Sequence, residues 1–129
     1  MDAKTVVRTE DAPAPFQGAP YSQAIQAAGL VFVSGQLGLK PGHTEMAGES
    51  IGEQTEQVMQ NLAAILAAAG TGMDRLVKTT VFLTNLDDFQ GMNEVYAQHV
   101  GAEPPARATV EVGRLPSGAL VEIEAIALA

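Results

Sequence analysis

ARATVEV (residues 106–112) and VEIEAIA (residues 121–127) are two strand-like runs that carry ionised side chains within otherwise apolar sequence. Side chains alternate between two faces along a strand, so Arg107 and Thr109 share a face, and so do Glu122 and Glu124. An arginine and a carboxylate fixed on strands suit a site for a small acidic substrate, because arginine pairs with carboxylates and glutamate can move protons. The alternation alone favours a simpler interpretation, in which these charges form the wet face of a half-buried sheet.

Strand-like and helical patterns follow one another along the chain as three strands, a helix, a strand, a helix and two strands. Strand-helix-strand order predicts parallel crossovers, which place both helices on one face of the sheet. Nothing else in the chain can cover the other face, so we expect that face to pack against copies of itself. The sequence thus predicts about six strands and two helices in a single domain, residues 1–129. The other predicted strands cover residues 5–9, 21–27, 30–34 and 76–83.

Both predicted helices have recognisable ends. Ser50 and Glu53 form a capping box that opens the first helix, and Gly70 suits its end. Asn85 suits the N-cap of the second helix, which ends near Gly101. The apolar face of the second helix is predicted to comprise Phe89, Met92, Val95, Tyr96 and Val100.

Composition excludes several functional classes. A hydrophobic content of 47% with 17% charged residues indicates a folded globule. Seven basic and fifteen acidic residues give a net charge of −8, which opposes binding to nucleic acid or anionic membranes. The chain has no cysteine, and the segment 1–5 lacks the apolar core of a signal peptide, so we expect a cytoplasmic protein.

Six segments occur in an order and spacing that resemble the reactive intermediate deaminase (RidA, formerly YjgF) family. The resemblance spans nearly the whole chain. It implies an α+β, chorismate-mutase-like fold assembled as a homotrimer, with substrate clefts between neighbouring subunits. The segments are PYSQA (20–24), SGQ (34–36), KTTVFL (78–83), MNEVY (92–96), PARATV (105–110) and VEIEAIA (121–127).

The resemblance also implies the activity, a cofactor-free hydrolysis of enamine and imine intermediates released by pyridoxal-phosphate enzymes. The expected substrates are small 2-imino acids such as 2-iminopropanoate and 2-iminobutanoate, and the products are 2-oxo acids and ammonia. No metal site is expected, because His43 and His99 are far apart and lack metal-ligand spacing.

Site residues follow from the same resemblance. Arg107 corresponds to the family's carboxylate-binding arginine, and Glu122 to the glutamate that positions or activates water. Ala19 is a departure, since it separates Gly18 from Pro20 where the family commonly runs Gly-Pro-Tyr, and it bears on the loop before Tyr21. The substrate-binding residues are expected to be Tyr21, Ser34, Gly35, Asn93, Arg107 and Thr109, the last at a position where several relatives have Cys.

Three other functions remain open at this stage. The chain could act on 3-aminoacrylate in pyrimidine breakdown, or serve as a non-catalytic, ligand-binding or chaperone-like trimer. Nuclease or translation-inhibitor activity has also been attached to the family. The net charge of −8 and the absence of any run of Lys or Arg count against that last function.

Overall fold

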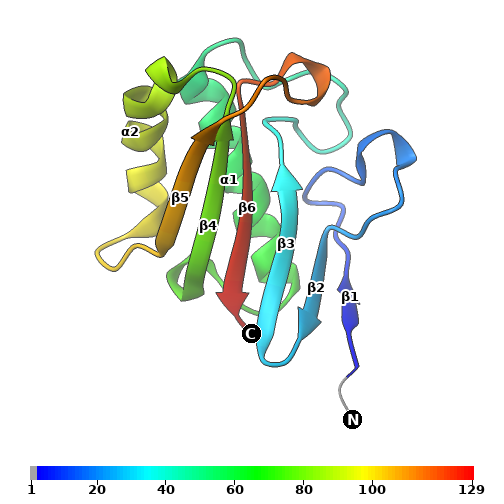
Figure 1. Ribbon diagram of the computed structural model, residues 1–129. Coiled ribbons are helices and arrows are strands. Elements are labelled where there is room, and N and C mark those ends of the chain that lie inside the picture. Colours follow the sequence, from blue (N-terminus) through cyan, green and yellow to red (C-terminus); the bar gives the residue numbers. More distant parts are fainter. Residues whose placement is uncertain (1–2) are drawn as a thin grey trace.

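Two α-helices cover one face of a six-stranded sheet in the computed structural model, which describes residues 3–129 (Figure 1). Met1 and Asp2, part of the segment used above to argue against a signal peptide, lie outside these residues. Within the described part of the chain, no helix combines the length and apolar character needed to cross a membrane. The elements are β1 (Thr5–Val7), β2 (Ala24–Ala27), β3 (Leu30–Gln36), α1 (Ile51–Ala68), β4 (Leu76–Leu83), α2 (Phe89–Val100), β5 (Ala106–Glu111) and β6 (Val121–Leu128).

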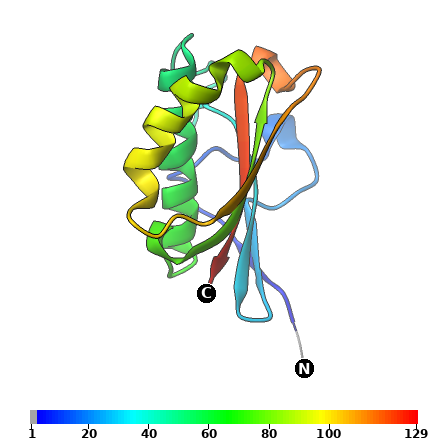
Figure 2. The same ribbon diagram turned by 60° about the vertical axis from the view of Figure 1, so that its left-hand side comes forward.

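The sheet is mixed, with the strand order β1-β2-β3-β6-β4-β5. β4 and β5 are parallel, and every other neighbouring pair is antiparallel. Because β3 and β4 both run antiparallel to β6, they point the same way. The chain therefore makes two parallel crossovers, through α1 and through α2, and both helices lie on the same face (Figure 2). This confirms the predicted α+β arrangement.

The main core lies between this face and the two helices. Alternate residues of β6 point toward α1, and Val121 and Ile123 are completely buried. Val58, Leu62 and Leu66 of α1 are equally buried and occupy one stripe of the helix, at the i, i+4, i+8 spacing of a core-facing helix. The apolar residues that alternate along β6 and those spaced one helical turn apart on α1 thus form one apolar layer.

The first helix has the predicted ends. The Ser50 hydroxyl accepts a hydrogen bond from the Glu53 amide at 3.1 Å, and the Glu53 carboxylate accepts one from the Ser50 amide at 3.3 Å. This reciprocal arrangement satisfies two amides that the helix itself leaves free. α1 ends at Ala68, and Gly70 follows with a positive φ of 83°.

The second helix begins differently from the prediction. Asn85 accepts from the Asp87 amide at 2.9 Å, but it caps a short 3-10 turn, and α2 starts only at Phe89. On its predicted apolar face Met92 and Tyr96 are buried, as is the more distant Val100. Phe89, predicted to share this apolar face, is the first residue of α2 and is 39% exposed.

The predicted strand over residues 21–27 is shorter in the structure and starts at Ala24. The cause is the buried side chain of Gln23, whose amide nitrogen donates to the carbonyls of Thr9 and Pro13 and whose oxygen accepts from the Thr9 amide at 2.8 Å. These side-chain bonds replace main-chain pairing with β1, which ends at Val7, while the Gln23 carbonyl still accepts a hydrogen bond from the Ser34 amide at 2.9 Å.

No helix covers the opposite face of the sheet in the described residues. One row of paired positions crosses four strands of this face and consists of Val6, Ile25, Phe32 and Ile126. Val6 and Phe32 are 48% and 42% exposed. A contiguous apolar row open to water is typical of a protein–protein interface, which supports the expectation that this face packs against copies of the chain.

Candidate functional site

Glu122 lies on the uncovered face, at a pocket of about 440 Å³. It projects from the central strand β6 and is paired in register with Phe82 of β4. Three other predicted site residues, Tyr21, Ser34 and Gly35, line the same pocket. We call these four residues the glutamate half-site.

The Glu122 carboxylate is held close to the main chain of β3. A Cβ atom added to Gly35 would lie 2.6 Å from Glu122 Oε2, so only glycine leaves the carboxylate in its place. Burial raises the pKa of Glu122, and the nearby negative charge of Glu124 raises it further. A carboxyl group whose pKa is moved toward neutrality is better matched to proton transfer than an ordinary surface glutamate.

The loop before β2 fixes Tyr21 despite the additional Ala19. The Tyr21 hydroxyl accepts a hydrogen bond from the Phe16 amide at 2.6 Å, which leaves the phenolic proton free to be donated. The Ser34 hydroxyl donates to the Ser22 carbonyl at 2.6 Å. Ser34 therefore ties this loop to β3, and its own hydroxyl proton is already used.

Arg107 lies on the edge strand β5 and lines a second pocket, of about 380 Å³, together with Asn93 of α2. Its guanidinium carbon is 4.8 Å from the ring centre of Tyr96 and 5.5 Å from that of Phe89. No described residue forms an ion pair with it, since the one ion pair among these residues joins His99 and Glu56. An arginine held by aromatic faces keeps its charge uncompensated and available to an acidic ligand.

Thr109 is the third predicted site residue in this region, two positions beyond Arg107 on the same face of β5. Its hydroxyl oxygen is buried and has no hydrogen-bond partner. We call Asn93, Arg107 and Thr109 the arginine half-site.

The two half-sites lie on opposite faces of the sheet. Arg107 is paired with Thr79, which faces the helices, whereas Glu122 is paired with Phe82 on the uncovered face. The two residues are also two strands apart, about 10 Å, and three residues apart along the strands, about another 10 Å. A small 2-imino acid cannot contact both in one chain, because its carboxylate adjoins its imine carbon.

Sequence reasoning missed several residues that shape these pockets. Phe16, Leu37 and Pro116 line the glutamate half-site as apolar walls, and loops distant in the sequence bring them together. Tyr96 was expected only as a core residue, and no sequence signal indicated its contact with Arg107. Among residues 3–129, no group of three His, Asp or Glu side chains could hold a metal ion.

The chain matches a family model described as Endoribonuclease L-PSP over residues 9–129. It belongs to the RidA (YjgF/L-PSP) family. Among RidA-family relatives, a RutC family protein of Pyrococcus horikoshii is 48% identical, and the match covers 96% of this chain and 97% of that protein. Reactive Intermediate Deaminase A, chloroplastic, of Arabidopsis thaliana is 50% identical, with coverage of 96% of this chain and 65% of that protein.

Solved structures agree with this assignment. RidA from the Antarctic bacterium Psychrobacter sp. PAMC 21119 has a TM-score of 0.91 and 42% identity, over 97% of this chain and 99% of that chain. A structure of Escherichia coli TdcF with bound serine has a TM-score of 0.89 and 36% identity, over 97% and 98% of the two chains.

Proposed function

We propose that this RidA-family protein is a deaminase that hydrolyses small 2-imino acids to 2-oxo acids and ammonia. The observation that carries the proposal is the unpaired guanidinium of Arg107, which lines a pocket at an edge of the sheet and has no carboxylate partner among the described residues. The relative named Reactive Intermediate Deaminase A supports the reaction class, and the serine-bound TdcF structure supports a small ligand that bears a carboxylate.

Arg107 would bind the substrate carboxylate through two parallel N–H···O bonds, each worth about 1.5–3 kcal/mol as a charged hydrogen bond. This contact fixes the adjacent imine carbon. Asn93 lines the same pocket and would contact the bound acid beside the guanidinium, whereas Thr109 does not line this pocket and its hydroxyl is buried.

Glu122 would act on the water. The oxygen of water bonds to the imine carbon and one proton of this water passes to the nitrogen, so the carbon now carries a hydroxyl and an amino group. The hydroxyl proton then passes to the amino nitrogen as the carbon–nitrogen bond breaks, which releases ammonia and leaves the carbonyl group of the 2-oxo acid. A glutamate with a raised pKa can take the proton from water and return it to the leaving nitrogen, a contribution of about 10²–10⁴-fold in rate. The free phenolic proton of Tyr21 can be donated to the substrate nitrogen or to this water.

The complete site would require two copies of the chain, because Arg107 and Glu122 lie on opposite faces of one sheet. We propose a homotrimer in which the arginine half-site of one subunit meets the glutamate half-site of its neighbour. A closed ring of three subunits would form three equivalent sites and leave no half-site unpaired. The exposed apolar row on the uncovered face supports this association.

A purified-protein assay tests the activity. A serine dehydratase generates 2-aminoacrylate, and semicarbazide traps the imine that has not been hydrolysed. We expect the protein to reduce trapping, Arg107→Ala to lose this effect, and Arg75→Ala, which removes an exposed arginine from another part of the surface, to keep it. Trapping that the wild-type protein leaves unchanged with several imino acids would exclude the function.

A comparison of substrates and two further assays separate the alternatives. Faster hydrolysis of 3-aminoacrylate than of 2-aminoacrylate would favour a role in pyrimidine breakdown. Undiminished client protection by Arg107→Ala would favour a chaperone-like trimer. RNA cleavage that survives metal chelation and rigorous repurification would favour the activity in the family model's description, against which the net charge of −8 counts. A cytoplasmic location stays a prediction, since one relative is named chloroplastic.

A further inference from the structure

The guanidinium of Arg107 rests on a stripe of one helix. Phe89, Met92 and Tyr96 lie three and four residues apart on α2, which places them on the same side of the helix. Arg107 Nη1 is 4.0 Å from the sulfur of Met92, and the Tyr96 ring is the nearer of the two aromatic rings. Rings and a thioether attract a cation without adding a negative charge that would compete with an acidic ligand.

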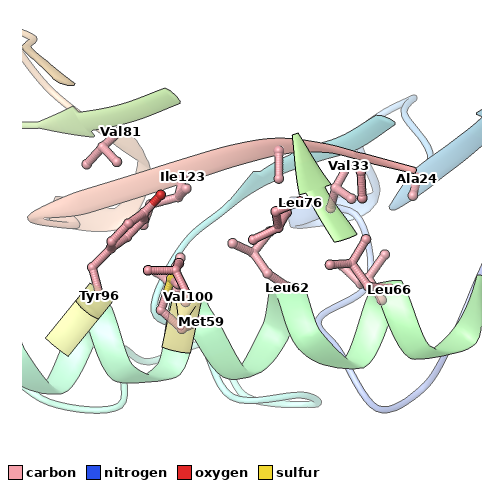
Figure 3. Close-up of a cluster of buried hydrophobic side chains, with 14 of the residues drawn as sticks. Ala24, Val33, Met59, Leu62, Leu66, Leu76, Val81, Tyr96, Val100 and Ile123 are labelled. Atoms are coloured by element: carbon pink, nitrogen blue, oxygen red, sulfur yellow. The ribbon is translucent and has the colours of Figure 1, made fainter. Parts of the chain in front are cut away.

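Tyr96 is itself fixed at the far end of its ring. Its hydroxyl shares a hydrogen bond of 2.7 Å with the hydroxyl of Thr79 on β4. Tyr96 is only 5% exposed and Thr79 is completely buried. Figure 3 shows the tyrosine reaching from its helix toward the sheet, with its oxygen at the sheet end.

These contacts connect Arg107 back to its own strand pair through Tyr96 and Thr79. Thr79 is the residue paired with Arg107 in the parallel ladder between β4 and β5. The strand pair that carries the arginine backbone therefore also holds, through Thr79 and Tyr96, the ring on which the guanidinium rests. Core packing alone would need only an apolar ring here, and phenylalanine would supply it, whereas the Thr79 bond fixes where the ring lies.

We propose that Tyr96 is a positioning residue for Arg107 and that Thr79 fixes Tyr96 in that role. The inference rests on the proposed function in one respect, that Arg107 binds the carboxylate of the substrate. An arginine side chain held in its binding geometry beforehand loses less conformational entropy when the ligand arrives. Contact of the guanidinium with the two rings also leaves N–H groups at its edge for the carboxylate, apart from the Nη1 group that donates to the Met92 sulfur.

A double-mutant cycle between Tyr96 and Arg107 tests the inference. The ligand is 2-oxobutanoate, whose Kd is measured by calorimetry, and KM and kcat are measured for the imine. Loss of the ring in Tyr96→Leu is expected to raise Kd and KM about 3- to 30-fold, the range of a cation–π contact, with kcat changed much less. Tyr96→Phe, which keeps the ring and loses the Thr79 bond, should show a smaller increase. In the Arg107→Ala background, Tyr96→Leu should have almost no further effect.

Val58→Ala is the matched control, because it truncates a completely buried side chain of α1 that belongs to neither half-site. It should lower stability while Kd and KM stay at their wild-type values. Should Tyr96→Leu fail to fold, Thr79→Val replaces it in the same cycle, with an expected increase in Kd similar to that of Tyr96→Phe.

Additive effects of the Tyr96 and Arg107 substitutions would overturn the inference, as would an unchanged Kd in Tyr96→Leu. If the wild-type protein binds 2-oxobutanoate with the expected coupling and hydrolyses no imine, the proposed function fails and the positioning role stands. If it neither binds the oxo acid nor hydrolyses the imine, both fail.

Discussion

The two half-sites hold their charges in different ways. Glu122 lies on the central strand β6, half-buried against the main chain of Gly35, and burial raises the pKa of its carboxyl group. Arg107 lies on the edge strand β5, where rings from α2 hold a guanidinium that has no ion-pair partner among the described residues. The first arrangement suits a group that exchanges protons, and the second suits a permanent charge that binds an acid, as the proposed function requires.

Because they lie on opposite faces of one sheet, the proposed function needs two copies of the chain. A small substrate cannot reach from β5 on the helix side to β6 on the uncovered side. The chain therefore carries two complementary halves that a neighbouring copy can join. The account predicts that each half can be damaged separately, with different consequences for binding, proton transfer and stability.

The largest effect is expected from the arginine half-site. Arg107→Ala removes two charged hydrogen bonds to the carboxylate, and we expect kcat/KM to fall by about 10²–10⁴-fold. Arg107→Lys keeps the charge and loses the two-pronged geometry, so its loss should be intermediate. Steady-state kinetics measure the loss, and light scattering checks that the oligomer is unchanged. An Arg107→Ala protein with wild-type kinetics would disprove the assigned role.

Glu122→Gln should lower kcat by about 10²-fold or more, because the amide cannot accept a proton from water. The same substitution should raise stability at pH 7. With a raised pKa, the folded protein still holds the proton at pH values where the unfolded chain has released it, so ionisation of Glu122 lowers stability as pH rises through this interval.

Glutamine cannot ionise, so Glu122→Gln avoids the loss of stability that ionisation of Glu122 causes. The variant should therefore unfold at a higher temperature than the wild type at pH 7. The difference should vanish at acidic pH, where Glu122 is protonated in both states. Thermal unfolding at the two pH values checks the sign, and a variant less stable at pH 7 alone would refute it.

Gly35→Ala tests the close contact within the glutamate half-site. The added Cβ would meet the carboxylate of Glu122, a flexible group that can move away, so we expect about a tenfold loss of kcat with little change in stability. Gly38→Ala is the matched comparison, because its Cβ would lie 2.9 Å from the backbone of Gln54, which cannot move as easily. It should lower the unfolding temperature more. Equal effects of the two substitutions on stability would contradict this distinction.

The smallest effect is expected from Glu124→Gln. Burial is the main cause of the raised pKa of Glu122, and the charge of Glu124 is the second. Removing that charge should shift the acidic limb of the kcat profile to lower pH, while burial keeps the pKa of Glu122 above its ordinary value. A shift toward higher pH would show that Glu124 does not repel the ionised Glu122.

The sequence predicted most of the fold because its signals are local. The capping box at Ser50 and Glu53, the alternation within 121–127 and the order of elements each depend on neighbouring residues, and the structure confirms them. The predicted start of the second strand at Tyr21 was wrong by three residues, because the side chain of Gln23 bonds to a segment ten or more residues earlier in the chain.

The site was predicted less completely, because its geometry depends on contacts between segments that are far apart in the sequence. Arg107 and Glu122 were identified through the resemblance, but face alternation within each strand says nothing about which of the two faces the helices cover. Only the register with Thr79 and Phe82 reveals that they point to opposite sides. The support of Arg107 by Tyr96 also depends on how α2 crosses the sheet, which no local pattern encodes.

The account's central claim is that one subunit supplies Arg107 and its neighbour supplies Glu122, and subunit mixing tests it most directly. Arg107→Ala and Glu122→Gln chains are unfolded together, refolded as a 1:1 mixture and assayed. If sites form between subunits of a ring, about one quarter of them combine both intact residues, so two inactive proteins should yield about one quarter of wild-type activity. A 1:1 mixture of wild type with the Arg107→Ala/Glu122→Gln double variant should also give about one quarter. No activity in the first mixture and about one half in the second would place both residues of each site in a single chain and contradict the account.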